Sequence, residues 1–115
     1  MKTLRVTENL TPDTEYLLTA SMDSTQLKNC VGQTLVVDGL ALLEDVKRDT
    51  GEVIQIARVA ADGEVYATSS PTFVSALEAA WDFSERRNMP IKALEIRTGH
   101  SKNGRDYLTC KALFN

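Results

Sequence analysis

The residues whose types are most suited to binding a ligand form one polar turn near the C-terminal end, Gly99-His-Ser-Lys-Asn-Gly-Arg-Asp106. This turn lies between two apolar runs and presents Lys102 and Arg105 at a loop tip, where a phosphate backbone can reach them. Residues 86–115 contain seven basic and two acidic side chains, whereas residues 1–85 contain six basic and fourteen acidic ones. The pattern predicts local contact with nucleic acid, although charge segregation of this size is also common in soluble proteins.

Binding of a single strand needs cations that follow the backbone and flat rings that stack on bases. Tyr66 and Tyr107 are the stacking candidates, because each occupies an expected strand beside a basic loop; the alternative is cross-strand packing. Phe73 and Trp81 are expected in the core instead, since they share the apolar face of a helix. The predicted nucleic-acid-binding residues are Lys47, Arg48, Arg58, Tyr66, Arg97, His100, Lys102, Arg105, Tyr107 and Lys111.

The sequence contains no recognisable catalytic motif. No serine or cysteine motif surrounds His100, and a loop histidine beside a lysine is more often solvated or phosphate-facing than a general base. The acidic pairs Glu44-Asp45 and Asp62 with Glu64 lack the context of a calcium loop or a glycosidase and are expected at turns and on the surface. There is no Walker, dinucleotide-binding or HExxH motif. We therefore expect no enzymatic activity, no catalytic residue, no metal and no cofactor.

Length and composition set further bounds. A chain of 115 residues, 43% hydrophobic and 25% charged, fits one globular domain over residues 1–115. It has no apolar run of membrane-spanning length and no apolar signal segment, which predicts a cytoplasmic protein without membrane contact. Cys30 and Cys110 lack metal-binding spacing, so reduced thiols are expected. A pI of about 5.1 argues against coating duplex DNA by bulk charge, so any binding is expected in one groove.

Short helical segments and then three strands are expected in the first part of the chain. Thr11 and Pro12 are typical of a helix start, and a second helical turn is expected from Ser24 to Cys30. The first strand is expected to bend or bulge at Asp38-Gly39. Glycine-containing turns separate the strands, which are expected over Gln33–Val46, Glu52–Ala60 and Glu64–Thr68.

The apolar period then changes to that of a helix. Ser70 is its expected cap, Pro71 its first residue, and Arg86-Arg87 its last turn. The residues on its apolar face are Phe73, Leu77, Ala80 and Trp81. Two final strands, about Ile91–Thr98 and Asp106–Phe114, are expected on either side of the basic turn.

The expected order is a short helical N-terminal region, three antiparallel strands, one helix and two strands. This is the order of the OB-fold, a mainly β, five-stranded, partly open barrel with a helix between strands 3 and 4. Its ligand groove uses strands 2 and 3 and the loops joining strands 1–2 and 4–5, here Val46–Gly51 and Gly99–Arg105. A three-layer or open-sheet α+β domain can carry the same order, and this alternative stays open.

Several segments carry a resemblance to a known family. They are Ala61-Asp-Gly-Glu-Val-Tyr-Ala-Thr-Ser-Ser-Pro-Thr-Phe73, Arg97-Thr-Gly-His-Ser-Lys-Asn-Gly-Arg-Asp-Tyr-Leu-Thr-Cys110, Glu15-Tyr-Leu-Leu-Thr19 and Leu43-Glu-Asp-Val46. In this order and spacing, over about residues 14–113, the chain resembles small phage-encoded single-stranded DNA-binding proteins of Gram-positive hosts.

The resemblance implies an OB-like barrel that serves phage DNA replication. It matches Lys102, Gly104 and Arg105 to the family's loop between strands 4 and 5, and Tyr66 and Tyr107 to positions that often hold aromatics. Arg86-Arg87 at the helix end and the lack of an acidic C-terminal tail depart from the pattern. Without that tail, recruitment of replication or recombination proteins does not follow from the resemblance.

The leading hypothesis is a non-catalytic protein that binds single-stranded DNA with little sequence preference during phage or prophage replication or recombination in the host cytoplasm. The competing hypothesis is a small phage protein–protein interaction module that binds a host or replication partner through its acidic face. The acidic residues 1–85 favour this second hypothesis. The sequence predicts neither the oligomeric state nor a preference for DNA over RNA.

Overall fold

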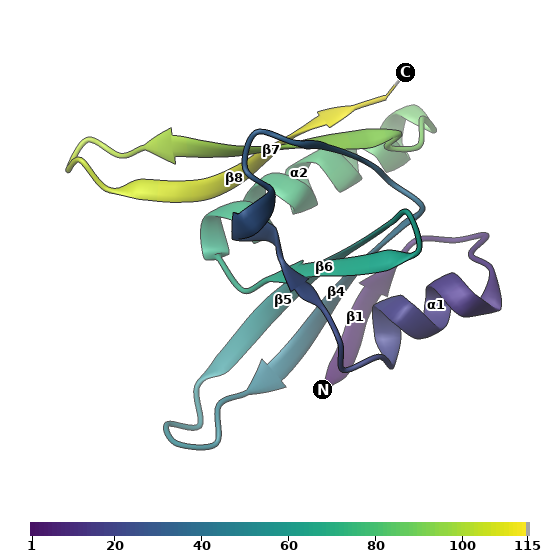
Figure 1. Cartoon of the computed structure of the whole chain (residues 1–115), viewed down its shortest axis with the longest axis horizontal. Coiled ribbons are helices and arrows are strands. Elements are labelled where there is room, and N and C mark those ends of the chain that lie inside the picture. Colours follow the sequence, from purple (N-terminus) through teal and green to yellow (C-terminus); the bar gives the residue numbers. More distant parts are fainter. Residues whose placement is uncertain (115) are drawn as a thin grey trace.

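The computed structural model describes residues 1–114 and is mainly β, with two α-helices and two sheets (Figure 1). The five-stranded sheet contains, in spatial order, β1 (Lys2–Val6), β4 (Gly39–Val46), β5 (Val53–Ala61), β6 (Glu64–Thr68) and β2 (Thr25–Gln26). The three-stranded sheet contains β3 (Thr34–Val36), β7 (Ala93–His100) and β8 (Asp106–Leu113). The helices are α1 (Pro12–Thr19), α2 (Pro71–Arg87) and the 3₁₀ turn η1 (Leu27–Cys30).

The long strand predicted over residues 33–46 does bend at its middle, where it passes from one sheet to the other. β3 pairs with β7, whereas β4 pairs with β1 and β5. Between them the Val37 amide donates to the Lys92 carbonyl (2.9 Å), and the next amide, that of Asp38, donates to the Ala60 carbonyl (2.8 Å). Adjacent residues thus bond to opposite sheets, and this crossing joins the two sheets.

The mainly β class is as predicted, but the five-stranded, partly open barrel is wrong in strand number, and the two sheets do not form a barrel. The described residues form eight strands in two sheets that do not close, because β6 pairs with β2 and makes no pairing with β8. Near Leu108 the edge of β8 is taken by α2 instead, since the Thr72 hydroxyl donates to the Leu108 carbonyl (2.6 Å). The N-terminal region, expected to be only helical, supplies β1 and β2 at the two edges of the five-stranded sheet.

Helix α1 begins as the sequence predicts. The Thr11 hydroxyl accepts from the Thr14 amide at 3.2 Å, and Pro12 occupies the first turn, where no amide donor is needed. The helical turn expected over Ser24–Cys30 forms only at η1, because Thr25–Gln26 pairs with β6 as β2. Two residues are too few for an alternating pattern to be visible in sequence.

Helix α1 packs on the outer face of the five-stranded sheet. Leu18 is fully buried there, in a cluster with Ala41, Leu43, Ala60 and Val65. A Cβ atom at Gly39 would lie 2.7 Å from Leu10 Cδ2 and 2.8 Å from Leu18 Cδ1. The missing side chain at Gly39 therefore lets α1 and the preceding loop approach the sheet.

The main core lies between the two sheets and α2. Phe73, Leu77 and Trp81 on the predicted apolar face of α2 are buried among residues of both sheets, as expected. The helix also ends where predicted, with Asn88 in the left-handed conformation (φ 52°) directly after Arg87. None of the helices within residues 1–114 combines the length and apolar character needed to cross a membrane.

The alternation predicted for the last strand is confirmed, and it places one thiol in the core. Leu108, Cys110 and Ala112 of β8 pack against the main cluster. Burial raises the pKa of the Cys110 thiol to about 11. The Cys30 thiol also has a raised pKa, first through burial and then through the charge of Glu64, and both cysteines are free.

Native Cys110 is expected to react slowly with DTNB near pH 8, because a pKa of about 11 leaves little thiolate, the reactive species. Unfolding in urea should restore fast labelling of both thiols. Since the folded pKa lies above the ordinary value of 9.0, the stability linked to this thiol is present below pH 9 and is lost as the pH rises toward 11. Rapid labelling of both cysteines in the native protein would contradict this assignment.

Candidate nucleic-acid interface

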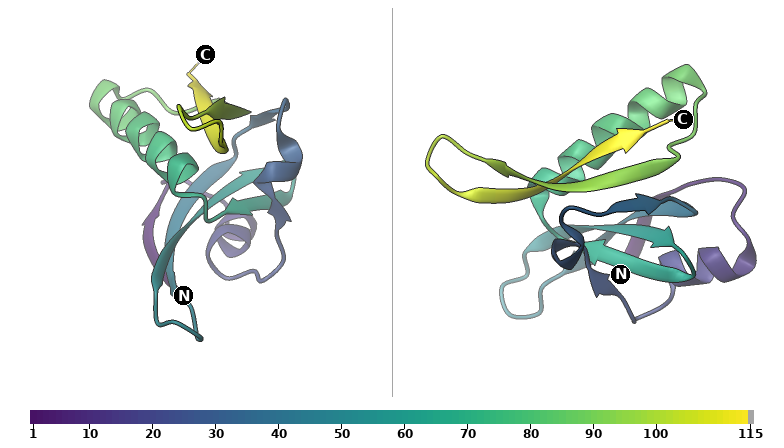
Figure 2. Two further views of the ribbon diagram at one scale, coloured as in Figure 1. Left: turned by 90° about the vertical axis from the view of Figure 1, so that its left-hand side faces the viewer. Right: turned by 45° about the horizontal axis from the view of Figure 1, so that its top comes forward.

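Two hairpins, β4–β5 and β7–β8, project toward the same side of the molecule, as Figures 1 and 2 show. Their tips correspond to the two loops that the sequence places beside a ligand groove. Gly51 and Gly104 close the tips with positive φ (70° and 77°), a conformation that favours glycine. In the second tip the Gly104 amide donates to the Ser101 carbonyl at 3.0 Å, which holds Lys102 and the neighbouring residues in a tight turn.

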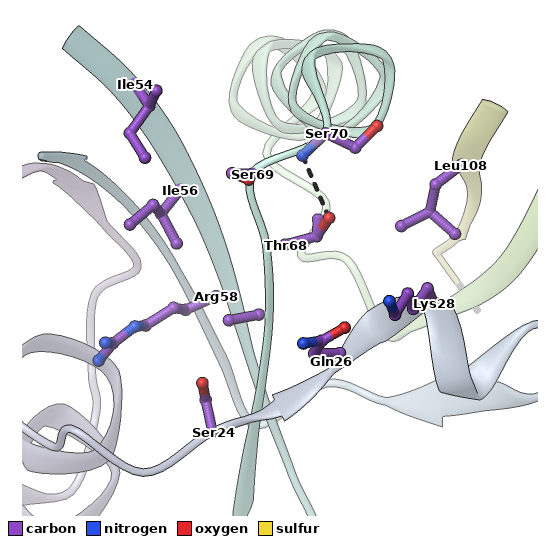
Figure 3. A pocket seen from close by; sticks show the side chains of 11 residues that line it. Ser24, Gln26, Lys28, Ile54, Ile56, Arg58, Thr68, Ser69, Ser70 and Leu108 are labelled. Carbon is purple, nitrogen blue, oxygen red and sulfur yellow. Dashed lines mark hydrogen bonds between the residues drawn. The ribbon is translucent and has the colours of Figure 1, made fainter. Parts of the chain in front are cut away.

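A groove of about 600 Å³ lies between the two hairpins (Figure 3). Ile54 and Ile56 of β5 line one side, Leu108 of β8 lines the other, and the β6–α2 connection lies between them. The segment that contains β2 and η1 adds Gln26 and Lys28. None of the eleven lining residues is acidic, although the net charge of the chain is −3.

The groove exists because β5 is longer than its neighbour β6. Pairing between them ends at Ala57 with Thr68, whereas the pairing of β5 with β4 continues as far as Val53. Residues 53–56 therefore have no strand partner on their second edge within the described chain, and main-chain groups there are available to a ligand. Ile54 and Ile56 are only partly buried and add an apolar surface.

Helix α2 starts at this groove. The Thr68 hydroxyl accepts from the Ser70 amide (3.1 Å), and the Ser70 hydroxyl lies 2.9 Å from that of Thr72. Ser70 is therefore the N-cap residue by position, as predicted, but its side chain caps no amide. The positive end of the helix dipole and a group of hydroxyls add to the attraction for anionic groups.

The predicted cations differ in how far their charge is compensated. Two exposed cations have acidic partners, Glu52 for Lys47 (3.7 Å) and Glu95 for Arg97 (3.1 Å). The exposed His100 Nδ1 lies 2.7 Å from Asp106 Oδ1, which is an ion pair only when the imidazole is protonated. Such exposed pairs are weak, so a phosphate can compete for the cation. The cations without an ion pair among residues 1–114 include Lys28, Arg48, Lys102, Arg105 and Lys111.

Arg58 has a different role from the one predicted. Its side chain is 4% exposed, and Nη1 donates to the carbonyl oxygens of Ser21 (2.8 Å), Leu18 (3.3 Å) and Leu17 (3.5 Å). Burial lowers the pKa of the guanidinium, and its Nε has no hydrogen-bond partner in the described residues. Figure 3 shows the side chain directed away from the centre of the groove. Its charge holds the C-terminal end of α1 against the sheet.

Neither predicted stacking residue lines the groove. The Tyr66 ring packs against the main core, its hydroxyl donates to Glu64 Oε2 (3.2 Å), and burial, followed by this hydrogen bond, raises its pKa. Tyr107 is 37% exposed and lies over Gly99 on the outer face of the three-stranded sheet. Since the two tyrosines lie in different sheets, they do not form a cross-strand pair with each other.

Sequence reasoning missed several residues of the groove. Ile54 and Ile56 alternate with Arg58 along one face of β5, a signal that assigns them to the same side of the sheet. Lys28 gives no comparable signal, because its position depends on the two-residue strand β2 and on the turn that follows it. Within residues 1–114 no group of three or more His, Cys, Asp or Glu side chains is arranged to hold a metal ion.

Comparison with known proteins adds no relative: no protein-family model, curated protein or solved structure matches the chain.

Replacing Arg58 with methionine is expected to lower the free energy of unfolding by about 2–3 kcal/mol, because buried carbonyl oxygens lose a charged donor. Urea denaturation followed by circular dichroism measures the change. Arg48→Met, on the exposed tip of the β4–β5 hairpin, is the matched control and should stay within about 0.5 kcal/mol of the parent. Equal stability of the two variants would show that the Arg58 contacts do not secure α1.

Proposed function

We propose that the protein binds single-stranded DNA, without catalysis and with little sequence preference, in the groove between the β4–β5 and β7–β8 hairpins. The observation that carries the proposal is the charge of this groove. Lys28 lies in its wall, Lys102 and Arg105 lie at the tip of one bordering hairpin, and no acidic side chain lines it. In a protein of net negative charge, such a groove is a local site for an anionic polymer.

The arrangement of the strands supports an OB-like reading of the fold. From residue 34 onward the chain forms a bent strand (β3 and β4), two further strands, helix α2 and two last strands. That is the OB-fold order, and the groove lies between the two hairpins whose tips are the loops that this fold uses for ligands. Because β6 pairs with β2 and not with β8, this is an open variant, in which the groove lies between the β6–α2 connection and β8.

The lining favours a single strand over a duplex. Ile54, Ile56 and Leu108 offer apolar surface to bases, which a duplex keeps stacked inside. The cations around the groove can neutralise phosphates while the bases contact the apolar side chains that line it. We further propose a role in phage or prophage DNA replication or recombination, which rests on the sequence resemblance alone.

Affinity for oligo-dT is expected to fall as salt increases. If Lys28, Lys102, Arg105 and one cation of the β4–β5 tip neutralise about four phosphates, log K falls against log salt with a slope near −3, from about −0.7 per phosphate. Fluorescence titration with poly-dT at several salt concentrations measures this slope. A slope near zero would be incompatible with phosphate contacts in the groove.

The double substitution Lys102→Ala and Arg105→Ala is expected to weaken oligo-dT binding by about 10-fold or more at 0.1 M salt, and to reduce the salt slope by about 1.4. The matched control is Arg86→Ala with Arg87→Ala. It removes the same charge from the C-terminal end of α2, whereas the N-terminal end of this helix lies at the groove (Figure 1). The control should retain most of the affinity. An equal loss in both variants would indicate a response to net charge and not to the hairpin tip.

An alternative function has one observation in its favour. Tyr16 and Met22 are 61% and 84% exposed, close in sequence to the acidic residues Asp13, Glu15 and Asp23. This surface fits a protein–protein module that binds a basic partner. A gel-shift assay with single-stranded DNA, single-stranded RNA and duplex separates the two functions, since absence of any nucleic-acid complex would leave only the alternative.

A further inference from the structure

The ring of Tyr107, on the β7–β8 hairpin, lies over a glycine of the neighbouring strand. Gly99 is its cross-strand partner, and a Cβ atom at Gly99 would lie 2.4 Å from Tyr107 Cζ and 2.5 Å from its hydroxyl oxygen. The ring therefore lies against the main chain of β7, in space that any other residue at 99 would fill. One side of the ring is covered in this way, while 37% of the residue stays exposed.

This ring faces away from the groove. Cross-strand partners in a sheet point to the same side, and successive residues point to opposite sides. Leu108, the next residue, lines the groove and packs against the core, so Tyr107 projects from the opposite, outer face of the three-stranded sheet. No hydrogen bond of its hydroxyl is present within residues 1–114.

Cations share this outer face with Tyr107. Arg97 pairs with Thr109, one step diagonally from the Tyr107 ring, and Lys111 follows one step further along β8. Both cations are exposed, and Glu95, which contacts Arg97 at 3.1 Å, is the acidic residue between them. The outer face thus combines a flat ring, exposed on one side, with a surplus of positive charge.

We propose that this outer face of the β7–β8 hairpin is a second nucleotide-binding surface, on which one base stacks against the exposed side of Tyr107 while Arg97 and Lys111 contact the phosphates beside it. The inference rests on the proposed function of the groove and extends it. A strand that leaves the groove passes the hairpin tip, where Lys102 and Arg105 lie, and continues onto the outer face. A short strand fills only the groove, and a longer one reaches both surfaces.

The experiment compares oligo-dT of increasing length, from about 4 to about 16 nucleotides, the range of sites on single OB-like domains. For the parent protein, affinity should increase at the length that first reaches Tyr107. Tyr107→Leu should leave binding of the short oligonucleotides unchanged and weaken binding of the long ones by about 5-fold or more, the lower end of one base–aromatic stack. Tyr107→Phe is the matched control and should behave as the parent, because the hydroxyl is not required.

Two further variants address the ring without removing it. Gly99→Ala displaces the ring from the strand and should reproduce the loss seen for Tyr107→Leu. Tyr107→Trp keeps a stacking ring and adds an exposed fluorophore, whereas the native Trp81 is buried. Its emission should be quenched by long oligonucleotides and not by short ones. Thermal melts of all variants identify any loss of folding.

The outcomes separate this inference from the proposed function. If the parent binds oligo-dT at every length equally well and Tyr107→Leu matches it, the second surface is excluded while the groove stands. The same conclusion follows if Gly99→Ala retains the full affinity for long oligonucleotides, or if Tyr107→Trp shows no quenching. If the parent binds no oligo-dT of any length, the groove and the second surface are both excluded.

Discussion

The structure depends on one strand crossing between its two sheets. The Val37 amide bonds to the carbonyl of Lys92, directly before β7, and the Asp38 amide bonds to that of Ala60 in β5, so the first residues of β4 and β7 are anchored at the same point. Each of these strands continues into a long hairpin. Both hairpins start from this common point and project the same way (Figure 1), and residues of their strands, Ile54 and Ile56 of β5 and Leu108 of β8, line a shared groove. The groove is thus a result of backbone topology, and side chains determine its charge.

Turn and periodicity signals predict much of this fold from the sequence. Asp62-Gly63 predicts the β5–β6 turn, where both residues have positive φ, and the spacing of Phe73, Leu77 and Trp81 predicts α2 and its buried face. These signals depend only on residues close together in the sequence, and the turn and the helix form from those residues. The pairing of β2 with β6, in place of a pairing of β6 with β8, depends on contacts between distant segments, which single-sequence patterns do not contain.

The candidate site divides in the same way. That the turn around Lys102 is a hairpin tip follows from its glycines and polar residues. The position of Arg58 does not follow, because a lone arginine in a strand has the same sequence signature whether it faces solvent or the end of a helix. Tyr66 and Tyr107 carry equal signals beside basic loops, yet the first faces the core and the second the outer surface. Whether a strand residue faces the core or the solvent depends on which face of the sheet its side chain occupies, and this is known only once the pairing of the sheet is known.

The unpaired stretch of β5 also bears on how the protein behaves in concentrated solution. Residues 53–56 expose a free strand edge, next to Val46 and Val53, which are 54% and 56% exposed. Such an edge can template sheet extension between molecules, a first step toward aggregation. The charged residues at the adjoining tip, Lys47, Arg48, Asp49 and Glu52, oppose such pairing because extension of the sheet would remove charged side chains from water. Replacing them with neutral residues would therefore favour self-association, independently of any ligand in the groove.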